Sequence, residues 1–180
     1  MRFHLLFPAL LFAGSISLGA AEFTLYSNDL AGQLTKKQEF SGFGCNGSNI
    51  SPELHWSHPP KGTKSFALTV YDPDAPTGSG WWHWVVFNIP SSTTSLPADF
   101  GNTAKNHPLT AVQGMTDFGK TGFGGACPPK GDRAHRYFFT VHALDVERID
   151  VDEKASPALV GYMINAHSIG RATIVSYYAR

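Results

Sequence analysis

The sequence has little of several features that assign proteins to a class. Only 2 of its 180 residues are cysteine, charged residues make up 16%, and basic and acidic side chains number 14 each. Proteins that bind nucleic acid usually carry a clear surplus of Lys and Arg on one face, so this balance argues against a nucleic-acid partner. The chain also lacks an internal repeat or a low-complexity linker, and we therefore expect one globular domain.

The one long apolar run lies near the start of the chain. Arg2 precedes an apolar stretch over residues 5–18, and small residues follow at 19–21. These are the three parts of a cleavable secretory signal, and the stretch is shorter than the roughly 20 residues that span a bilayer. We expect a signal peptide over residues 1–21, a domain over residues 22–180, and a periplasmic or secreted protein without stable membrane insertion. An uncleaved anchor is the alternative.

The two cysteines, Cys45 and Cys127, both lie in glycine-rich segments. In an exported protein the oxidising surroundings favour a disulfide between them. That bond would close a long loop, for which chain-entropy models give roughly 4 kcal/mol of stabilisation. Two free thiols are the alternative, because the sequence does not show that the two Cα atoms approach to within about 7 Å.

Strands dominate the predicted secondary structure. The segments 65–71, 83–89 and 136–144 are short, rich in β-branched and aromatic residues, and bounded by turn residues. The near-continuous apolarity of the last two favours strands that are covered on both faces. We therefore expect a mainly β fold with an antiparallel sheet rather than a doubly wound α/β fold.

One helix is predicted near the end of the chain. Ser156 and Pro157 offer an N-cap and a first-turn proline, and apolar residues then recur at helical spacing. We expect Gly170 to follow the end of this helix and residues 172–178 to form a final strand or an extended tail. Residues 91–120 are rich in turn formers and predict a long irregular connection.

Three motif matches fail in their context. The glycines of segment 42–47 spell G-x-G-x-x-G, but Pro52 follows and no amphipathic helix begins there, so we predict a turn rather than a dinucleotide site. Asp72 and Asp74 imitate the start of a calcium loop, yet prolines stiffen the segment and the sixth position is not glycine. Ser79 lies between two glycines, but the spacing differs from the G-x-S-x-G of serine hydrolases.

Three other segments place rigid or small residues beside polar side chains at strand ends. Prolines fix the backbone of segment 72–76 and hold its carboxylates in defined directions. Segment 81–84 sets a histidine among tryptophans, for which an aromatic core with one satisfied histidine is the alternative. The glycines of segment 124–131 let backbone N–H groups approach a ligand and form an anion-binding nest.

Polar side chains add to these segments. His135 and Tyr137 lie two residues apart on a predicted strand and share one face, while Arg136 points the other way. Imidazole, phenol and backbone donors together suit a phosphate, a phosphate ester or a carboxylate. A bare carboxylate would repel such an anion, so we expect Asp72 to lie behind a histidine, where it fixes the tautomer and raises the pKa of the ring.

The same segments resemble those of the phosphatidylethanolamine-binding protein family, especially its bacterial Raf-kinase-inhibitor-like branch. The motifs are Asp-Pro-Asp-Ala-Pro at 72–76, Trp-His at 82–83, and Cys-Pro-Pro-x-Gly at 127–131 leading to His-Arg-Tyr at 135–137. The resemblance implies a large central antiparallel sheet flanked by a smaller sheet and a few helices, with a pocket for phosphate-like groups. The ligand-binding residues implied by motif are Asp72, Pro76, His83, Pro129, His135 and Tyr137. Many bacterial members resemble one another in a Gly-Gly-Pro before the cysteine, where this chain has Gly125-Ala126.

The functional hypothesis is an exported binding protein, without cofactor or metal, that holds a phosphate-like or other small anion and regulates or inhibits a protein partner. A homodimer and a monomer are both compatible with the sequence. The alternative is a hydrolase that uses His83 or His135 as a general base with Asp72 as its orienting group. We do not expect an enzyme, because no Ser, Thr or Cys lies in an activating motif, and Cys127 could serve only as a free thiol.

Overall fold

The computed structural model describes residues 21–180, so all but the last residue of the predicted signal peptide lies outside the described residues. The elements, in chain order, are β1 (Thr24–Tyr26), β2 (Ser41–Gly42), β3 (Cys45–Asn46), β4 (Leu54–Ser57), β5 (Ser65–Asp72), β6 (Trp81–Pro90), β7 (Ser95–Leu96), β8 (Val112–Gln113), β9 (His135–Leu144), α1 (Pro157–His167) and β10 (Ser168–Tyr178). Within the described residues, no helix is long and apolar enough to cross a membrane.

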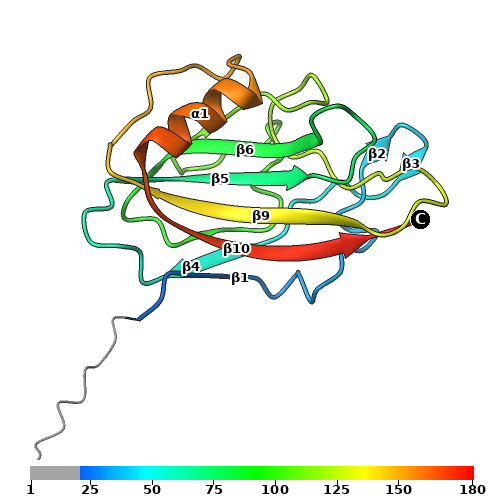
Figure 1. Ribbon diagram of the computed structural model, residues 1–180, viewed down its shortest axis with the longest axis horizontal. Coiled ribbons are helices and arrows are strands. Elements are labelled where there is room, and N and C mark those ends of the chain that lie inside the picture. The colour runs from blue at the N-terminus through cyan, green and yellow to red at the C-terminus, as the bar shows by residue number, and fades with distance from the viewer. Residues whose placement is uncertain (1–20) are drawn as a thin grey trace, which may run out of the picture.

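The fold is built around an antiparallel sheet of five strands in the order β10-β9-β5-β6-β8 (Figure 1). A smaller sheet, β1-β4-β7, packs against one face of it, and the main hydrophobic core lies between the two sheets. Trp56 and Phe66 meet across this core with ring centroids 5.3 Å apart. The expected mainly β architecture, with a large antiparallel sheet and a smaller one, is confirmed.

The helix covers part of the opposite, outer face of the large sheet (Figure 1). It begins as predicted, with the Ser156 hydroxyl accepting a hydrogen bond from the Leu159 amide at 3.2 Å. Val160 and Ile164 are buried on its sheet-facing side. Because an eleven-residue helix covers only part of this face, the expectation that residues 136–144 are covered on both faces is wrong for the first half of the strand.

The chain after the helix differs from the prediction. Helix α1 ends at His167 and β10 begins at the next residue, so the expected tail is an eleven-residue strand. Gly170 lies inside that strand at a register irregularity, not at a helix cap. A Cβ atom at this position would lie 2.5 Å from Cγ of Pro60, which explains why a glycine is required here.

The disulfide and the glycine turn agree with the sequence. Cys45 and Cys127 are bonded, with their Cα atoms 6.0 Å apart. Strands β2 and β3 form a hairpin whose two loop residues, Phe43 and Gly44, both have positive φ. The glycines of segment 42–47 therefore form a turn, as predicted, and the disulfide ties this hairpin to the segment that begins at Cys127.

Candidate functional site

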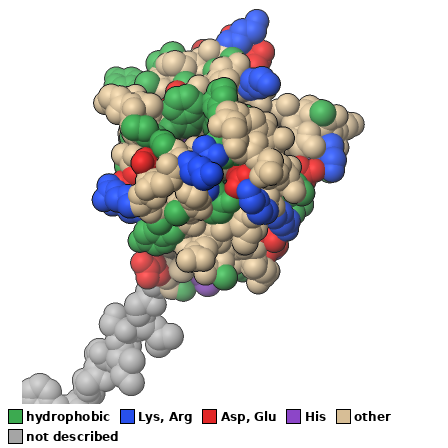
Figure 2. Space-filling model, turned by 90° about the vertical axis from the view of Figure 1, so that its right-hand side faces the viewer, with side chains coloured by type: hydrophobic (Ala, Val, Ile, Leu, Met, Phe, Trp, Pro, Cys, Tyr) green, Lys and Arg blue, Asp and Glu red, His purple; other side chains and the backbone are tan. Residues whose placement is uncertain are grey.

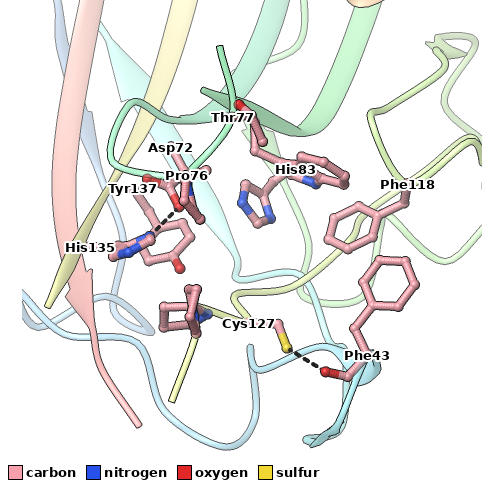
Figure 3. Close-up of a pocket in the computed structure, with 13 residues that line it drawn as sticks. Phe43, Asp72, Pro76, Thr77, His83, Phe118, Cys127, His135 and Tyr137 are labelled. Atoms are coloured by element: carbon pink, nitrogen blue, oxygen red, sulfur yellow. Dashed lines mark hydrogen bonds and ion pairs between the residues drawn. The ribbon is translucent and has the colours of Figure 1, made fainter. Parts of the chain in front are cut away.

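A cavity of about 210 Å³ opens at one end of the large sheet (Figure 3). At this end β5 ends and β6 and β9 begin (Figure 1). Three separate segments reach this end because antiparallel strands bring the C-terminus of one beside the N-terminus of the next. The cavity is lined by Phe43, Asp72, Ala75, Pro76, Thr77, Trp81, His83, Phe118, Cys127, Pro128, Pro129, His135 and Tyr137. All six ligand-binding residues proposed from the sequence are in this set.

His135 and Asp72 form a buried pair at the base of the cavity. The Nδ1 atom of His135 lies 2.8 Å from Oδ2 of Asp72, and the two side chains are only 2% and 3% exposed (Figure 3). The carboxylate thus lies behind an imidazole, as the sequence suggested, and orients the ring. The other nitrogen, Nε2, lies 3.4 Å from Oδ2 of Asp132, so His135 is bracketed by two carboxylates.

His83 is held by backbone carbonyl groups on the facing wall. Its Nδ1 lies 2.8 Å from the Gly124 oxygen and 3.1 Å from the Gly125 oxygen. Carbonyl oxygens only accept hydrogen bonds, so Nδ1 carries the proton and a neutral ring presents Nε2 as an acceptor. Burial lowers the pKa of His83, an effect that the two carbonyl groups and the charge of Asp72 oppose only in part.

Tyr137 places an unpartnered donor in the same cavity. The residue is 1% exposed, and its hydroxyl has no hydrogen-bond partner among the described residues. Burial, followed by the negative charge of Asp72, raises the pKa of this phenol far above its usual range, so the hydroxyl keeps its proton. The ring lies edge-on to His83 with centroids 5.1 Å apart, and the hydroxyl points into the cavity (Figure 3).

Aromatic residues that the sequence reasoning did not assign to the pocket form its outer wall. Phe43, at the tip of the β2–β3 hairpin, is 70% exposed and stacks on Phe118 with centroids 5.8 Å apart. Phe118 in turn meets His83 and Trp81, and the indole Nε1 of Trp81 is a second buried donor without a partner in residues 21–180. Phe118 lies within the segment interpreted as an irregular connection, and no local sequence signal marks its role.

Residues 124–126, at the start of the glycine-rich segment, do not form the expected anion-binding nest. The amide groups of Gly124, Gly125 and Ala126 donate to the His83 carbonyl, the Asn49 side chain and the Gln38 carbonyl, respectively. They are therefore not free to bind a ligand. The glycines are needed for close packing instead, because a Cβ atom on Gly125 would lie 2.1 Å from the Gln38 oxygen.

The second carboxylate of segment 72–76 supports the site from outside. Both oxygens of Asp74 are bound by the guanidinium of Arg136 at 2.9 Å, and Arg133 adds a further contact at 2.9 Å. Arg136 therefore points away from the cavity, as predicted. At this end of the molecule, blue and red side chains are interspersed among apolar ones (Figure 2). No Lys or Arg is among the residues that line the cavity, so its polar interior consists of hydrogen-bonding groups and one carboxylate.

The cavity offers a small, mostly apolar volume with four polar side chains that converge: Asp72, His83, His135 and Tyr137. Within residues 21–180, no group of three or more His, Cys, Asp or Glu side chains is arranged to hold a metal ion. Cys127 contributes to the wall as half of a disulfide and not as a thiol. The site can therefore bind a small polar group through hydrogen bonds while an attached apolar group contacts the aromatic wall.

Comparisons with known proteins agree with this architecture. The family model described as phosphatidylethanolamine-binding protein matches residues 31–179. The UPF0098 protein YbcL of Escherichia coli is 58% identical over 167 residues, which cover 91% of each chain. The UPF0098 protein YbhB of the same organism is 55% identical over 157 residues, covering 86% of this chain and 99% of the relative.

Solved structures give the same assignment. The crystal structure of E. coli YbcL, described as a new member of the mammalian PEBP family, superposes with a TM-score of 0.86 at 58% identity over 89% of this chain and 99% of that one. A homologue from Chlamydia trachomatis superposes with a TM-score of 0.72 at 30% identity over 88% and 97% of the two chains. From the shared motifs, the fold and these relatives, we conclude that the chain belongs to the phosphatidylethanolamine-binding protein family.

Proposed function

We propose that this protein is a binding module that holds a small anionic group, a phosphate, phosphate ester or carboxylate, in the cavity around Tyr137. One observation carries the proposal: the hydroxyl of Tyr137 is buried in the cavity without an acceptor among the described residues. A buried donor left unpaired costs about 1–3 kcal/mol, and a ligand oxygen would recover that cost. The partnerless Trp81 indole on the same wall adds a second such donor.

The protonation state of His83 limits which anions fit the cavity. His83 presents an acceptor in its neutral form, so it suits either an anion that still carries a proton or an anion that binds together with a proton taken up by the ring. Burial lowers the pKa of His83, so the ring is neutral at pH 7. We therefore expect affinity to rise as the pH falls below 7, because protonation turns Nε2 from an acceptor into a donor.

A binding role is favoured over hydrolysis by the same geometry. The hydroxyl of Thr77, which lines the cavity, donates to the Gly80 carbonyl at 2.6 Å, and Cys127 is held in a disulfide. Neither side chain is paired with a histidine, as an activated nucleophile requires. The proposal therefore assigns His83 and His135 to binding, and includes regulation of a protein partner whose anionic group enters the cavity.

We also propose that the protein works in an oxidising compartment outside the cytoplasm, periplasmic or secreted. The support is the Cys45–Cys127 disulfide, since such bonds persist mainly in exported proteins, together with the signal-like sequence of residues 1–21. Addition of a thiol reagent to the native protein, with and without prior reduction, checks the bond. Labelling of both cysteines before reduction would contradict it.

Calorimetric titration of the purified protein tests the anion site. Phosphate, phosphoethanolamine and acetate are titrated separately at pH 7.5 and pH 6.0 and at constant ionic strength. We expect saturable binding that is tighter at pH 6.0 and about tenfold weaker in Tyr137→Phe, which removes only the free hydroxyl. His135→Ala is expected to lose binding altogether, because it also releases Asp72.

The matched control is Tyr178→Phe, which removes a phenol hydroxyl from the C-terminal end of neighbouring strand β10, outside the residues that line the cavity. It is expected to bind each anion as the unsubstituted protein does. Negligible heats for all three anions, or equal affinities of the unsubstituted protein and Tyr137→Phe, would refute the proposed site.

A further inference from the structure

A second hollow lies on the outer face of the large sheet, beside helix α1. Its volume is about 590 Å³, within the range of small-molecule sites. Residues of four strands and the helix line it: Thr69, Tyr71, Trp82, Phe138, Thr140, His142, Gly161, Ile164, Asn165, Arg171, Thr173 and Val175. We call this hollow the sheet groove. It shares no residue with the cavity around Tyr137.

The groove exists because the helix is short. Side chains at alternate positions of β5 and β9 point to the outer face, and α1 covers them only at the end where it buries Val160 and Ile164. Beyond the helix, Tyr71 and Trp82 pack together with ring centroids 4.6 Å apart. Together with Phe138, which lies opposite Tyr71 in the sheet, they form a half-buried aromatic floor.

A buried histidine, His142, lies toward the helix end of this floor. His142 is 8% exposed; its Nε2 lies 3.3 Å from the hydroxyl of Thr69, while its Nδ1 is buried with no partner among the described residues. If Thr69 donates to Nε2, Nδ1 carries the proton and is a donor. Burial, and then the charge of Arg171, lowers the pKa of His142 to about 4, so the ring is neutral at pH 7.

Arg171 supplies the positive charge of the groove. It lies directly opposite His142 in the β9–β10 pairing and is exposed. Among the described residues it forms no ion pair, unlike Arg136 on the same face, which is bound by Asp74. None of the described residues that line the groove is acidic. The groove thus combines one uncompensated cation, a buried imidazole nitrogen and an aromatic floor.

We propose that the sheet groove is a second ligand site, which binds a small apolar carboxylic acid with its carboxylate at Arg171 and His142 and its hydrocarbon body on Tyr71, Trp82 and Phe138. A guanidinium pairs with a carboxylate through two parallel hydrogen bonds, and the buried Nδ1 of His142 gains the partner that the protein does not supply. The hydrocarbon body covers aromatic surface that the helix leaves in contact with water. This site is independent of the anion site around Tyr137.

The test is a titration of the isotope-labelled protein, followed by amide chemical shifts, with sodium 2-naphthoate and with sodium decanoate in separate experiments. Saturable shifts centred on Thr140, His142, Arg171 and Thr173 are expected for at least one acid. Tighter binding of naphthoate would assign the site to aromatic acids, and tighter binding of decanoate to aliphatic ones.

Four variants sharpen the test. Arg171→Gln is expected to raise the dissociation constant at least tenfold, whereas Arg148→Gln, which removes the same charge from an exposed position outside the groove, leaves it unchanged. Thr173→Trp fills the groove from the exposed edge strand and is expected to abolish binding without unfolding the protein. Tyr137→Phe is expected to leave the groove shifts and the dissociation constant obtained from them unchanged.

Four results would overturn the proposal: no shifts with either acid, shifts confined to the Tyr137 cavity, equal dissociation constants of the groove for Arg171→Gln and the unsubstituted protein, or groove signals that change with protein concentration before any acid is added. The last result would show that a second copy of the chain covers this face.

Discussion

Two buried polar clusters lie near the disulfide, one around Glu39 and one around Tyr137, and they differ in whether their polar atoms have hydrogen-bond partners. Around Glu39, which is fully buried, every oxygen has a donor: the Lys36 ammonium contacts both oxygens at 2.7 Å, the Asn46 amide donates at 2.9 Å, and the Tyr178 hydroxyl donates a short hydrogen bond. Around Tyr137, the hydroxyl has no partner among the described residues. A completed cluster stabilises the fold, whereas an incomplete one leaves hydrogen-bonding capacity for a ligand.

Their titration behaviour reflects the same difference. Burial alone would raise the pKa of Glu39, but hydrogen bonds from Lys36, Tyr178 and the Asn46 amide outweigh it and hold the pKa at about 2. Burial, with help from Glu39, raises the pKa of Tyr178 to about 12. For Tyr137, no cation or donor among the described residues offsets burial, which together with the charge of Asp72 raises the pKa of the phenol far above its usual range.

The largest effect is expected from removing the disulfide, which borders both clusters. The double variant Cys45→Ala, Cys127→Ala is expected to lower the free energy of unfolding by about 3–4 kcal/mol, because the unfolded chain regains the freedom of an 82-residue loop. Chemical denaturation measures this loss. Reduction of the unsubstituted protein should reproduce it, and a loss below about 1 kcal/mol would show that packing alone holds the hairpin in place.

The Glu39 cluster itself is tested by Glu39→Gln, with an expected loss of about 2–3 kcal/mol at pH 7, because the charge-assisted hydrogen bonds disappear. The folded-state pKa lies below the unfolded value, so Glu39 stabilises the protein fully above about pH 4.5 and loses this contribution as the pH falls through about 2. Denaturation curves at several pH values should therefore converge for the two proteins in acid. Lys36→Ala leaves the buried Glu39 carboxylate with only the Asn46 and Tyr178 donors among the described residues and should cost about 1–3 kcal/mol.

His142 is a third buried polar group, in which only one of the two ring nitrogens has a hydrogen-bond partner among the described residues. Its folded-state pKa of about 4 lies below the usual 6.5, so the unfolded chain takes up a proton first as the pH falls. Stability is expected to decrease by about 2 kcal/mol between pH 7.5 and pH 5 through this residue alone. His142→Gln should remove that part of the decrease, and exposed His58→Gln should not; equal slopes in all three proteins would contradict the assignment.

The smallest losses of stability are expected from substitutions of the two tyrosines, Tyr178 in the Glu39 cluster and Tyr137 in the cavity. Tyr178→Phe removes a donor from the completed cluster and should cost about 1–2 kcal/mol, whereas Tyr137→Phe removes an unpaired buried hydroxyl and should leave the free energy of unfolding unchanged or raise it, because the cost of burying that donor disappears. Thermal and chemical denaturation of the two variants measure the difference. Equal losses would show that the Tyr137 hydroxyl has a structural partner after all.

Sequence patterns located β5, β6, β9 and the start of the helix to within a few residues, because alternating apolar residues and the Ser156-Pro157 cap act locally. They did not locate the short strands, among them β1, β4 and β7 of the smaller sheet. The resemblance to the family's motifs implied the six cavity residues, and the fold brings them together because antiparallel strands place the ends of neighbouring segments side by side. The sequence did not reveal that the amide groups of Gly124 and Gly125 donate hydrogen bonds within the protein. Their acceptors, His83 and Asn49, lie about 40 and 75 positions earlier in the chain.

By itself, the sequence determined the class of the fold, the pairing partners available to its two cysteines and the residues at the strand ends. Only the tertiary structure decided which buried donors are left without an acceptor among the described residues, how far α1 extends over the sheet, and that Phe118 joins the cavity wall. The physical reason is that local preference depends on neighbours in the chain. Whether a polar group is satisfied depends instead on atoms that folding brings together from distant segments.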